Sequence, residues 1–326
     1  MARRAGVDLG GTKIQAVVMD DGGQVLGSSR QPTPTTGGPR DVVAAVAAAV
    51  REGVADAGVA LESLAGVGVG SPGDVDDRAG TVTSARNLPG WDGSFPVAGV
   101  LGEELEVPVS LANDVDVATV AEYELGSGRP YASLLGVFWG TGVGGGIVLD
   151  GKLWHGRASA GEIGHMVVKL GGARCPCGRK GCMEAYAGRG AMEARARREV
   201  EEGTRTELFK IMHKRGRTRL TSGVFARALE HGDELAVSLI DRAVEALGAA
   251  IASAVNLLDV EAVIIGGGLG VRLGTPYAER IERAMLPHLF SDYRPPAVGT
   301  AALGDLGGAI GAALLIPAGR PAQAPT

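Results

Sequence analysis

Short apolar runs alternate along the chain with longer segments in which apolar residues recur at helical spacing. The predicted helices span residues 41–57, 115–125, 184–199, 233–258 and 305–316, and the segment 233–258 is either one long helix or a broken one. The predicted buried strands span residues 65–70, 107–111 and 262–265. Because helices of this length separate the strands, the pattern predicts an α/β architecture.

A pattern near the N-terminus returns in the middle of the chain. The run GVDLGGT at 6–12 precedes the apolar segment 17–20, and the run GVFWGTG at 136–142 precedes the apolar segment 147–150. Each half predicts a hairpin with a glycine-rich tip, and one long-range repeat indicates two related domains rather than a solenoid. We expect a smaller N-terminal domain (1–115 with 303–316), a larger domain (116–302) and a disordered tail (317–326).

Composition narrows the classes of function. The chain has 326 residues, 45% of them hydrophobic, and a formal net charge of -5, without a block of basic residues. This argues against a nucleic-acid or membrane partner. The N-terminus lacks the apolar segment of a signal peptide, and the apolar run 246–258 is too short to span a bilayer. We therefore expect a cytoplasmic protein.

The first glycine-rich tip combines groups that bind phosphate. Glycines at 10 and 11 allow backbone N–H groups to approach an anion, and Thr12 and Lys13 can donate hydrogen bonds to it. Asp8 is placed to hold Mg²⁺, directly or through water. The spacing is not that of a Walker A loop, and a purely structural turn is the alternative. The second tip, 140–146, favours the phosphate interpretation because two such hairpins can bind one nucleotide.

Asp114 stands where a predicted strand ends and a predicted helix begins. One interpretation is an N-cap, a position that Asp favours. The other is catalytic, because phosphoryl transfer to an alcohol needs one carboxylate to orient and deprotonate the hydroxyl. The turn at Gly266, Gly267 and Gly268 likewise has two interpretations, a plain connection from strand to helix or close packing on an adenosine.

All three cysteines lie in one short segment. Cys175, Cys177 and Cys182 follow His165 closely, and glycine turns separate them. This spacing predicts a tetrahedral Cys₃His zinc site, which is structural because four protein ligands leave no open position; free thiols are the alternative. Such a site would also fix Glu162 and Glu184 toward a polyhydroxyl substrate, although an exposed position is the default for either glutamate.

These segments together resemble the ROK sugar kinases, and among them the bacterial ATP-dependent glucokinases. The resemblance extends from Val7 to about Ala313, and the zinc segment is its most specific part. It implies the two-domain actin-like (ribonuclease H-like) ATPase fold, with the active site in an interdomain cleft. It also implies a homodimer or homotetramer, with ATP, Mg²⁺ and structural Zn²⁺ as cofactors. ROK repressors carry a DNA-binding segment before the kinase-like part, for which the first strand, at about Ala5, leaves no room.

The resemblance assigns a role to each matching residue. Asp114 corresponds to the catalytic base, and His165 corresponds both to a zinc ligand and to a sugar ligand. The other implied sugar ligands are Ser71, Asn87, Asn113, Asp114, Glu162 and Glu184. The implied ATP and magnesium residues are Asp8, Gly10, Gly11, Thr12, Lys13, Gly140, Thr141, Gly142, Gly144, Gly266, Gly267 and Gly268.

The implied reaction is transfer of a phosphoryl group from ATP to the 6-hydroxyl of glucose. The alternatives are another hexose (mannose, fructose, N-acetylmannosamine or N-acetylglucosamine), polyphosphate as donor, or a sugar sensor without catalysis. The residues around a sugar's second carbon and along the donor channel decide among these alternatives, and the sequence does not resolve them.

Overall fold

The computed structural model describes residues 3–85, 87–157 and 159–318, and its chain divides into two compact units. The first unit comprises Met1–Gly126 and Ala302–Thr326, and the second comprises Ser127–Ala301. The division therefore follows Gly126, whereas the sequence placed it after residue 115. Helix α3 (Asp114–Glu124) stays in the first unit because it packs against α11 (Gly307–Leu314).

The first unit contains a five-stranded sheet in the order β3-β2-β1-β4-β8. Strand β1 runs antiparallel to β2 and parallel to β4, and β4 runs parallel to β8. The sheet strands are β1 (Arg3–Leu9), β2 (Lys13–Asp20), β3 (Val25–Pro32), β4 (Leu64–Ser71) and β8 (Val109–Asn113). The other elements are α1 (Pro39–Asp56), η1 (Leu61–Ser63), β5 (Asp74–Asp76), β6 (Thr81–Thr83), β7 (Ser94–Phe95), α2 (Val97–Leu105), α3, η4 (Gly304–Leu306) and α11.

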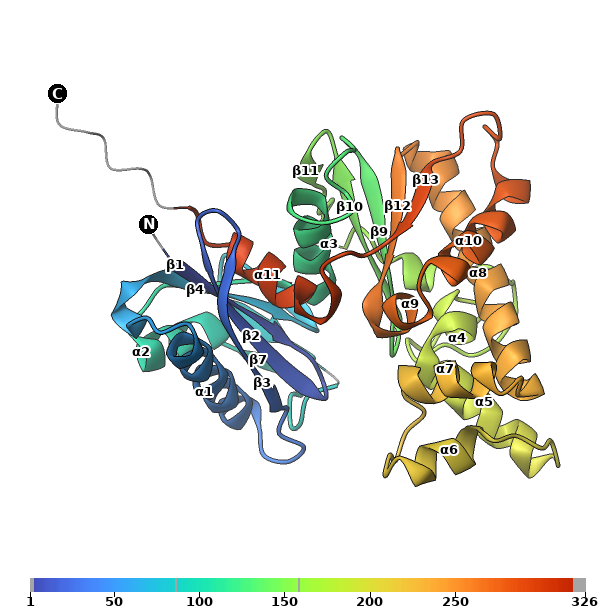
Figure 1. Ribbon diagram of the computed structural model, residues 1–326, viewed down its shortest axis with the longest axis horizontal. Coiled ribbons are helices and arrows are strands. Elements are labelled where there is room, and N and C mark those ends of the chain that lie inside the picture. Colours follow the sequence, from blue (N-terminus) through green and yellow to red (C-terminus); the bar gives the residue numbers. More distant parts are fainter. Residues whose placement is uncertain (1–2, 86, 158, 319–326) are drawn as a thin grey trace. The chain divides into compact units, whose positions relative to one another are not determined.

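Both faces of this sheet are covered by helices, as Figure 1 shows. Because side chains alternate along a strand, Val7 and Leu9 pack with α1 and α2, whereas Val17 and Met19 pack with α3 and α11. Helix α11 lies so close to β1 and β4 that a Cβ on Gly68 would collide with the carbonyl of Ala312. Residue 68, on the face of the sheet that packs against α11, must therefore be a glycine.

The second unit repeats the topology of the first. Its sheet has the order β11-β10-β9-β12-β13, in which β9 runs antiparallel to β10 and parallel to β12, and β12 runs parallel to β13. The strands are β9 (Leu134–Trp139), β10 (Val143–Leu149), β11 (Lys152–Leu153), β12 (Ala262–Gly266) and β13 (Ala297–Thr300). The repeated hairpins predicted two related units, and the shared topology agrees with that prediction.

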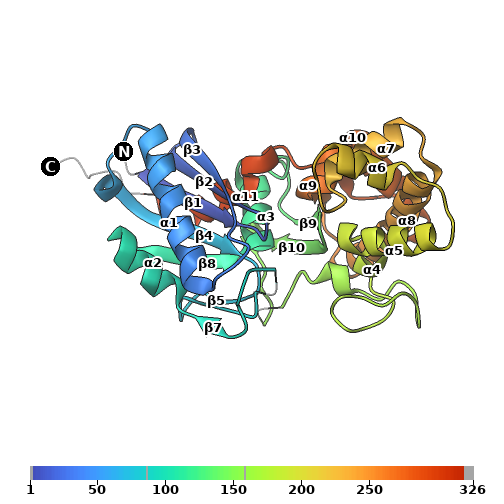
Figure 2. The ribbon, with the colours of Figure 1, turned by 90° about the horizontal axis from the view of Figure 1, so that it is seen from below.

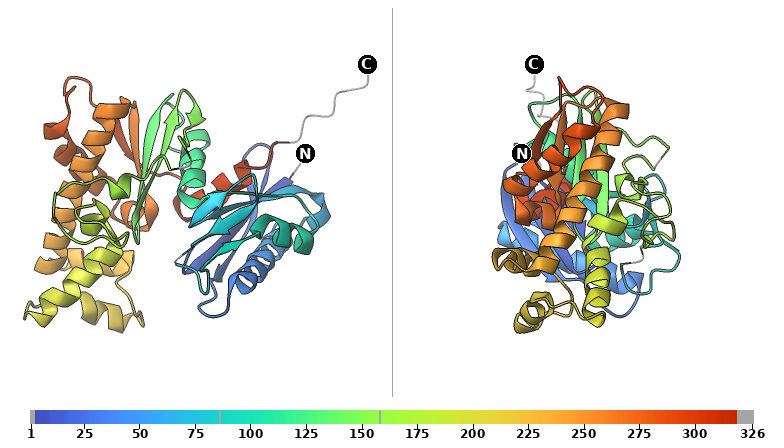
Figure 3. Two further views of the ribbon diagram at one scale, coloured as in Figure 1. Left: turned by 180° about the vertical axis from the view of Figure 1, so that it is seen from behind. Right: turned by 90° about the vertical axis from the view of Figure 1, so that its right-hand side faces the viewer.

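Most helices of the second unit lie between β11 and β12 in the sequence. They are η2 (Ile163–His165), α4 (Glu184–Ala187), α5 (Arg189–Glu201), α6 (Leu208–Lys214), α7 (Ser222–Glu230) and α8 (Glu234–Leu258). The remaining helices are α9 (Gly267–Leu273), α10 (Thr275–Met285) and η3 (Leu286–His288). Figure 2 shows the helices of this unit, α4 to α10. Helix α8 is continuous, is capped by Asp233 and packs along α10. Figure 3 shows that the segment between β11 and α4 is mostly loop. Among the described residues, no helix is long and apolar enough to cross a membrane.

Three predicted elements differ from the observed ones. The helix predicted over 184–199 is broken at Gly188, whose backbone is extended. The strand predicted over 107–111 lies two residues later, as β8, because Pro108 has no N–H to donate and Asn113 still pairs with Ser71. The helix predicted over 305–316 begins at Gly307, after a short 3₁₀ turn. Of the tail predicted to be disordered, residues 319–326 lie outside the described part.

Candidate functional site

In the first unit, the predicted polar residues lie at the carboxyl ends of adjacent parallel strands. Asp8 in β1 is in register with Gly70 in β4, and Ser71 in β4 is in register with Asn113 in β8. Asp114 follows Asn113 directly. In an α/β sheet, ligands bind beyond the carboxyl ends of the parallel strands, so the topology places these residues where a ligand is expected.

Asn113, not Asp114, caps helix α3. The Asn113 Oδ1 atom accepts hydrogen bonds from the N–H groups of Val115 (2.9 Å) and Asp116 (3.4 Å). Asp114 is therefore the first residue of the helix, and its Oδ1 accepts from the Val115 N–H at 3.0 Å. The N-cap interpretation of Asp114 is thus wrong, and its carboxylate is left for another role.

Burial changes the acidity of both carboxylates. The pKa of Asp114 is raised to about 6, mainly by burial and then by the negative charge of Asp8. Burial likewise raises the pKa of Asp8, while the nearby Lys13 ammonium lowers it. A carboxylate with a pKa of about 6 is mostly ionised at neutral pH and is more basic than an exposed aspartate, which suits a general base.

The first glycine loop, residues 10–13, is held by contacts to its backbone. The Thr33 hydroxyl donates to the Gly10 carbonyl at 2.6 Å, and the Thr33 N–H donates to the Thr12 carbonyl. A Cβ on Gly11 would lie 2.8 Å from the Asn87 carbonyl oxygen, so Asn87, which was predicted to bind sugar, packs on this loop. The Lys13 ammonium lies 4.0 Å from the Asp305 carboxylate. Arg86, which precedes Asn87, lies outside the described residues.

The second glycine loop, in the second unit, joins β9 to β10. The Gly140 N–H donates to the Gly142 carbonyl at 2.9 Å and closes the turn, whereas Gly144 lies within β10. The Glu184 Oε2 atom accepts from the Val143 N–H at 3.0 Å. A side chain at Gly142 would collide with the same carboxylate. Glu184, which was predicted to bind sugar, thus also fixes this loop.

The two glycine motifs of the second unit lie side by side. Gly266 ends β12 in register with Phe138 of β9, so Gly140 and Gly267 follow neighbouring carboxyl ends. A Cβ on Gly140 would lie 3.9 Å from the Gly268 nitrogen. Gly267 has a φ of +77°, and a Cβ there would meet the Trp139 backbone at 2.6 Å, so a glycine is required. This proximity fits one nucleotide in contact with both motifs.

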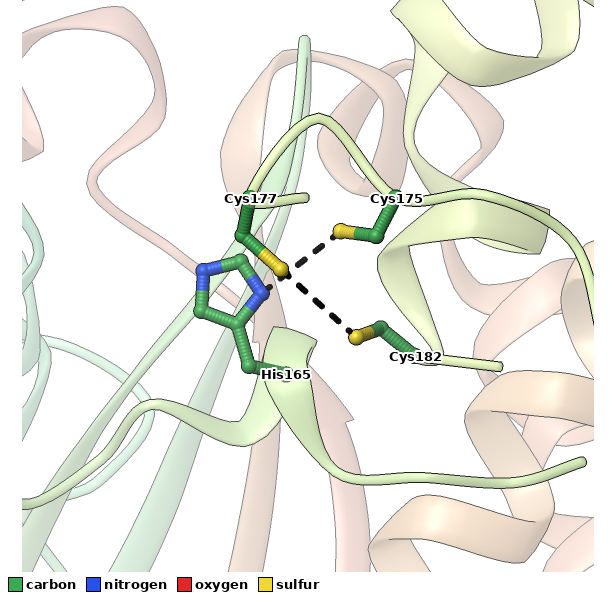
Figure 4. Close-up of side chains that lie close together, drawn as sticks. All are labelled: His165, Cys175, Cys177 and Cys182. Carbon is green, nitrogen blue, oxygen red and sulfur yellow. Dashed lines mark hydrogen bonds between the residues drawn. The ribbon is translucent and has the colours of Figure 1, made fainter. Parts of the chain in front are cut away.

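The predicted zinc ligands form one cluster (Figure 4). The ligand atoms of His165, Cys175, Cys177 and Cys182 lie within 4.8 Å of one another. The Cys177 and Cys182 sulfurs are 3.8 Å apart, and a tetrahedral ion with Zn–S bonds of about 2.3 Å separates its sulfurs by about 3.8 Å. The backbone N–H of Arg179 lowers the pKa of Cys177, whereas burial raises the pKa of Cys175 and of Cys182, so the fit to a metal rests on the geometry of the four ligand atoms. The four residues therefore fit a zinc ion.

His165 connects this cluster to Glu162. Its Nδ1 faces the Cys175 sulfur at 3.8 Å, and its Nε2 lies 3.7 Å from the Glu162 carboxylate. Figure 4 shows the imidazole with one nitrogen toward the sulfurs and the other directed away. Gly164 permits this arrangement, because a side chain there would collide with the Val143 carbonyl in β10. The geometry allows the two roles that the sequence assigned to His165.

A cavity of about 460 Å³ lies beside the loop that carries the three cysteines, residues 175–182, which we call the metal loop. Arg174, Arg195, Arg198 and Arg242 line it together with Tyr186. Among the predicted site residues only Cys175 contributes to its wall, so this cavity is separate from the glycine loops and from Glu162.

Sequence reasoning missed two residues that hold the glycine loops. Thr33 stands in an ordinary Thr-Pro segment, and nothing in that pattern identifies it. Arg189 donates to the Thr141 hydroxyl at 2.7 Å. Its position between Gly188 and Gly190, at the break in the predicted helix, is the one signal that could have found it.

Comparison with known proteins agrees with the site geometry. The chain is 33% identical to a glucokinase of Halalkalibacterium halodurans over 318 residues, covering 95% of this chain and 94% of that protein. It is 32% identical to an N-acetyl-D-glucosamine kinase of Escherichia fergusonii over 324 residues, covering 95% and 98%.

A solved structure of a ROK family glucokinase from Streptomyces griseus, in complex with glucose and AMPPNP, matches with a TM-score of 0.82 and 32% identity, covering 97% of this chain and 99% of that one. A ROK hexokinase from Thermus thermophilus matches with a TM-score of 0.77 and 33% identity, covering 96% and 97%. The predicted two-domain actin-like ATPase fold is thereby confirmed. The ROK family model matches residues 4–318, so the chain belongs to the ROK family.

Proposed function

We propose that this chain is an ATP-dependent glucokinase that converts glucose to glucose 6-phosphate. The observation that carries the proposal is the state of Asp114, a buried carboxylate with a pKa of about 6 at the end of β8. Asn113, rather than Asp114, is the N-cap that accepts hydrogen bonds from the first N–H groups of α3. The relatives named glucokinase, and the matching structure that contains glucose and AMPPNP, support the same reaction.

In the proposed reaction, Asp114 accepts the proton of the sugar's 6-hydroxyl. The hydroxyl oxygen forms a bond to the γ-phosphorus, the bond from that phosphorus to the β–γ bridging oxygen breaks, and ADP leaves with the electron pair. Lys13 and the backbone N–H groups of the two glycine loops stabilise charge on the phosphates. Magnesium, held by Asp8, would neutralise charge on the β- and γ-phosphates.

Substitution of Asp114 tests the role of the base. In a coupled assay with glucose and ATP, Asp114→Asn should reduce kcat by about 10³-fold or more while glucose still binds, since general-base catalysis and orientation of the nucleophile are both lost. Asp116→Asn is the matched control, with the same charge change in the same helical turn, and should lose only a few-fold. An Asp114→Asn enzyme close to wild type would refute the assignment.

The pH dependence of the wild-type enzyme gives an independent test. The base works only when ionised, so kcat/KM should fall as the pH drops through about 6, the pKa of Asp114. A profile that stays flat down to pH 5 would contradict the assignment of Asp114 as the base.

The identity of the sugar is the finer part of the proposal. The residues proposed to bind its hydroxyl groups are Ser71, Asn87, Asn113, Asp114, Glu162, His165 and Glu184. The N-acetyl-D-glucosamine kinase relative makes that sugar the second candidate, because its 32% identity to this chain equals that of the Thermotoga maritima glucokinase. Initial rates with glucose, mannose, fructose, N-acetylmannosamine and N-acetylglucosamine, each with ATP and with polyphosphate, decide the matter. A higher kcat/KM for an N-acetylated sugar would replace glucose in the proposal.

We also propose one structural zinc ion per chain, held by His165 and the three cysteines. A zinc ion there would complete the tetrahedron that the ligand atoms outline and would fix the ring orientation of His165. Metal analysis of freshly purified protein should find about one equivalent of zinc. We further propose a cytoplasmic homodimer or homotetramer, as is common in the ROK family, and light scattering would measure its mass.

A further inference from the structure

The break between α4 and α5 connects the start of α5 to the second glycine loop. The Arg189 N–H donates to the Gly140 carbonyl at 3.1 Å, and the Gly190 N–H donates to the Thr141 carbonyl at 3.0 Å. Helix N–H groups that usually remain without a backbone partner are thus used to hold the loop. The backbone of Arg189 is therefore fixed beside the predicted phosphate-binding turn.

The Arg189 side chain extends over the same turn. Its Nη2 donates to the Thr141 hydroxyl at 2.7 Å, and its Nη1 donates to the Ser222 hydroxyl at 3.1 Å. Ser222, the first residue of α7, is itself next to Gly268, where a Cβ would lie 3.6 Å from the serine oxygen. The guanidinium therefore lies where the two glycine motifs meet.

The Arg189 guanidinium forms no ion pair with any residue in the described part of the chain. Both of its hydrogen-bond partners are neutral hydroxyls. The Glu193 carboxylate is shared among other partners: it binds Arg197 at 2.6 Å, lies 3.7 Å from Arg219 and accepts from the Leu220 N–H at 2.9 Å. Burial and then the like charge of Arg219 lower the pKa of Arg189, and the negative charge of Glu193 offsets this only in part; an arginine stays protonated at neutral pH.

A half-buried cation that is held by neutral groups and repelled by a second cation is stabilised when an anion binds. A guanidinium has five N–H donors, more than its two hydroxyl partners need, and its planar shape suits phosphate oxygens. Thr141 lies in a turn already predicted to bind phosphate, so the anion expected here is the phosphate chain of a nucleotide.

We propose that Arg189 binds the phosphate groups of the donor nucleotide at the junction of the two glycine motifs. Arg219 adds to the positive potential there, without being tied to the loop by its own backbone. This inference rests on the proposed kinase function and adds a donor-binding residue to it.

A series of nucleotides tests the inference, because a phosphate contact must depend on the number of phosphates. Calorimetric titrations without sugar would compare ATP, ADP, AMP and adenosine with the wild-type chain and with Arg189→Gln. The variant should bind ATP about 10- to 100-fold more weakly, ADP less so, and AMP least, with adenosine unchanged. Arg198→Gln, the same charge change on the exposed side of the same helix, should bind all four as the wild type does.

Two results would overturn the inference. An Arg189→Gln protein that binds ATP as tightly as the wild type has lost no phosphate contact. Equal weakening for adenosine and ATP would mean that Arg189 only maintains the local structure. Should Arg189→Gln not fold, Arg189→Lys answers the same question, because it keeps the charge but loses the planar fork. A smaller loss that still grows with phosphate number supports the contact, and a uniform loss or none refutes it.

The kinase proposal can fail separately. A wild-type chain that binds no nucleotide, or that phosphorylates no sugar, would refute the proposed function. A wild-type enzyme that phosphorylates glucose, together with an unaffected Arg189→Gln variant, would refute only the role of Arg189.

Discussion

The two units have the same sheet topology and carry different chemistry. At the second-last position of the first strand, the first unit has Asp8 and the second has Phe138. The residues in register with them on the neighbouring parallel strand are Gly70 and Gly266. Gly266 leaves space for the Phe138 ring, whereas Gly70 leaves space for Val117 of α3. One scaffold thus supports a carboxylate pair in one unit and a glycine-lined turn in the other.

The units also differ in the segment after their third strand. In the first, β3 leads through a short loop to α1, whereas in the second the metal loop and helices α4–α7 intervene before α8. A core built from such a long insertion has many loops, and a metal ion with four ligands is an effective way to fix it. We therefore expect the second unit, unlike the first, to depend on the proposed zinc ion for its stability.

Removal of a metal ligand should therefore have the largest effect, and only on the second unit. Cys182→Ser should abolish zinc binding and destabilise that unit by more than about 4 kcal/mol, because metal binding and folding of the loop are coupled. Metal analysis and hydrogen exchange would measure both effects, with protection lost around 165–183 and kept in β1 and β4. Asp8→Asn is the control for metal content. Loss of protection throughout both units would contradict this division.

The close packing of α11 gives the next largest effect, in the first unit. Gly68→Ala places a Cβ against the Ala312 carbonyl, and such overpacking against backbone should cost about 3 kcal/mol. Gly99→Ala in α2, where a Cβ meets nothing within 4 Å, should instead stabilise by up to about 1 kcal/mol through helix propensity. Urea unfolding of both variants measures the contrast. Equal changes in the free energy of unfolding for the two variants would mean that α11 can move to accommodate the added methyl group at little cost.

Patterns within one segment were predictable, and contacts between segments were not. The two hairpins, the long helix α8 and the four clustered metal ligands could be read from spacing, since each depends on neighbours in sequence. The sequence did not show whether Asn113 or its neighbour Asp114 caps α3. The break at Gly188 was not predictable either, because the N–H of Arg189 donates to Gly140, which lies in a distant loop. For Arg189 the sequence offers only its two flanking glycines, and these do not show that it lies beside the distant second glycine loop.

The raised pKa of Asp114 in the first unit predicts a smaller effect on the free energy of unfolding, and this effect depends on pH. Burial and Asp8 raise the pKa of Asp114 from 3.8 to about 6 in the folded chain. The folded state therefore binds a proton more readily than the unfolded state, so this group lowers stability as the pH rises from about 4 to about 6. Asp114→Asn removes that penalty and should stabilise the protein by about 1 to 3 kcal/mol at pH 8.

The gain from Asp114→Asn should shrink as the pH falls toward 4, where the wild-type carboxyl is protonated in both states. Thermal unfolding of the two proteins between pH 5 and pH 8 measures the difference. Glu124→Gln, at the exposed end of the same helix, is the control and should show no such trend. A gain that is independent of pH would point to packing rather than charge.

The smallest effect concerns the way in which each unit holds its glycine loop. In the first unit, the neutral Thr33 hydroxyl donates a hydrogen bond to loop 10–13. In the second unit, the Glu184 carboxylate accepts one from the N–H of Val143, beside the second glycine loop. Thr33→Val keeps the shape but leaves the Gly10 carbonyl without that partner, which should cost about 1 kcal/mol. Ser63→Ala removes a hydrogen bond of equal length, 2.6 Å, in an exposed turn and should cost less. Because the loosened loop is proposed to bind phosphate, Thr33→Val should also raise KM for ATP a few-fold and leave KM for glucose unchanged. A change in glucose binding alone would assign this loop to the sugar.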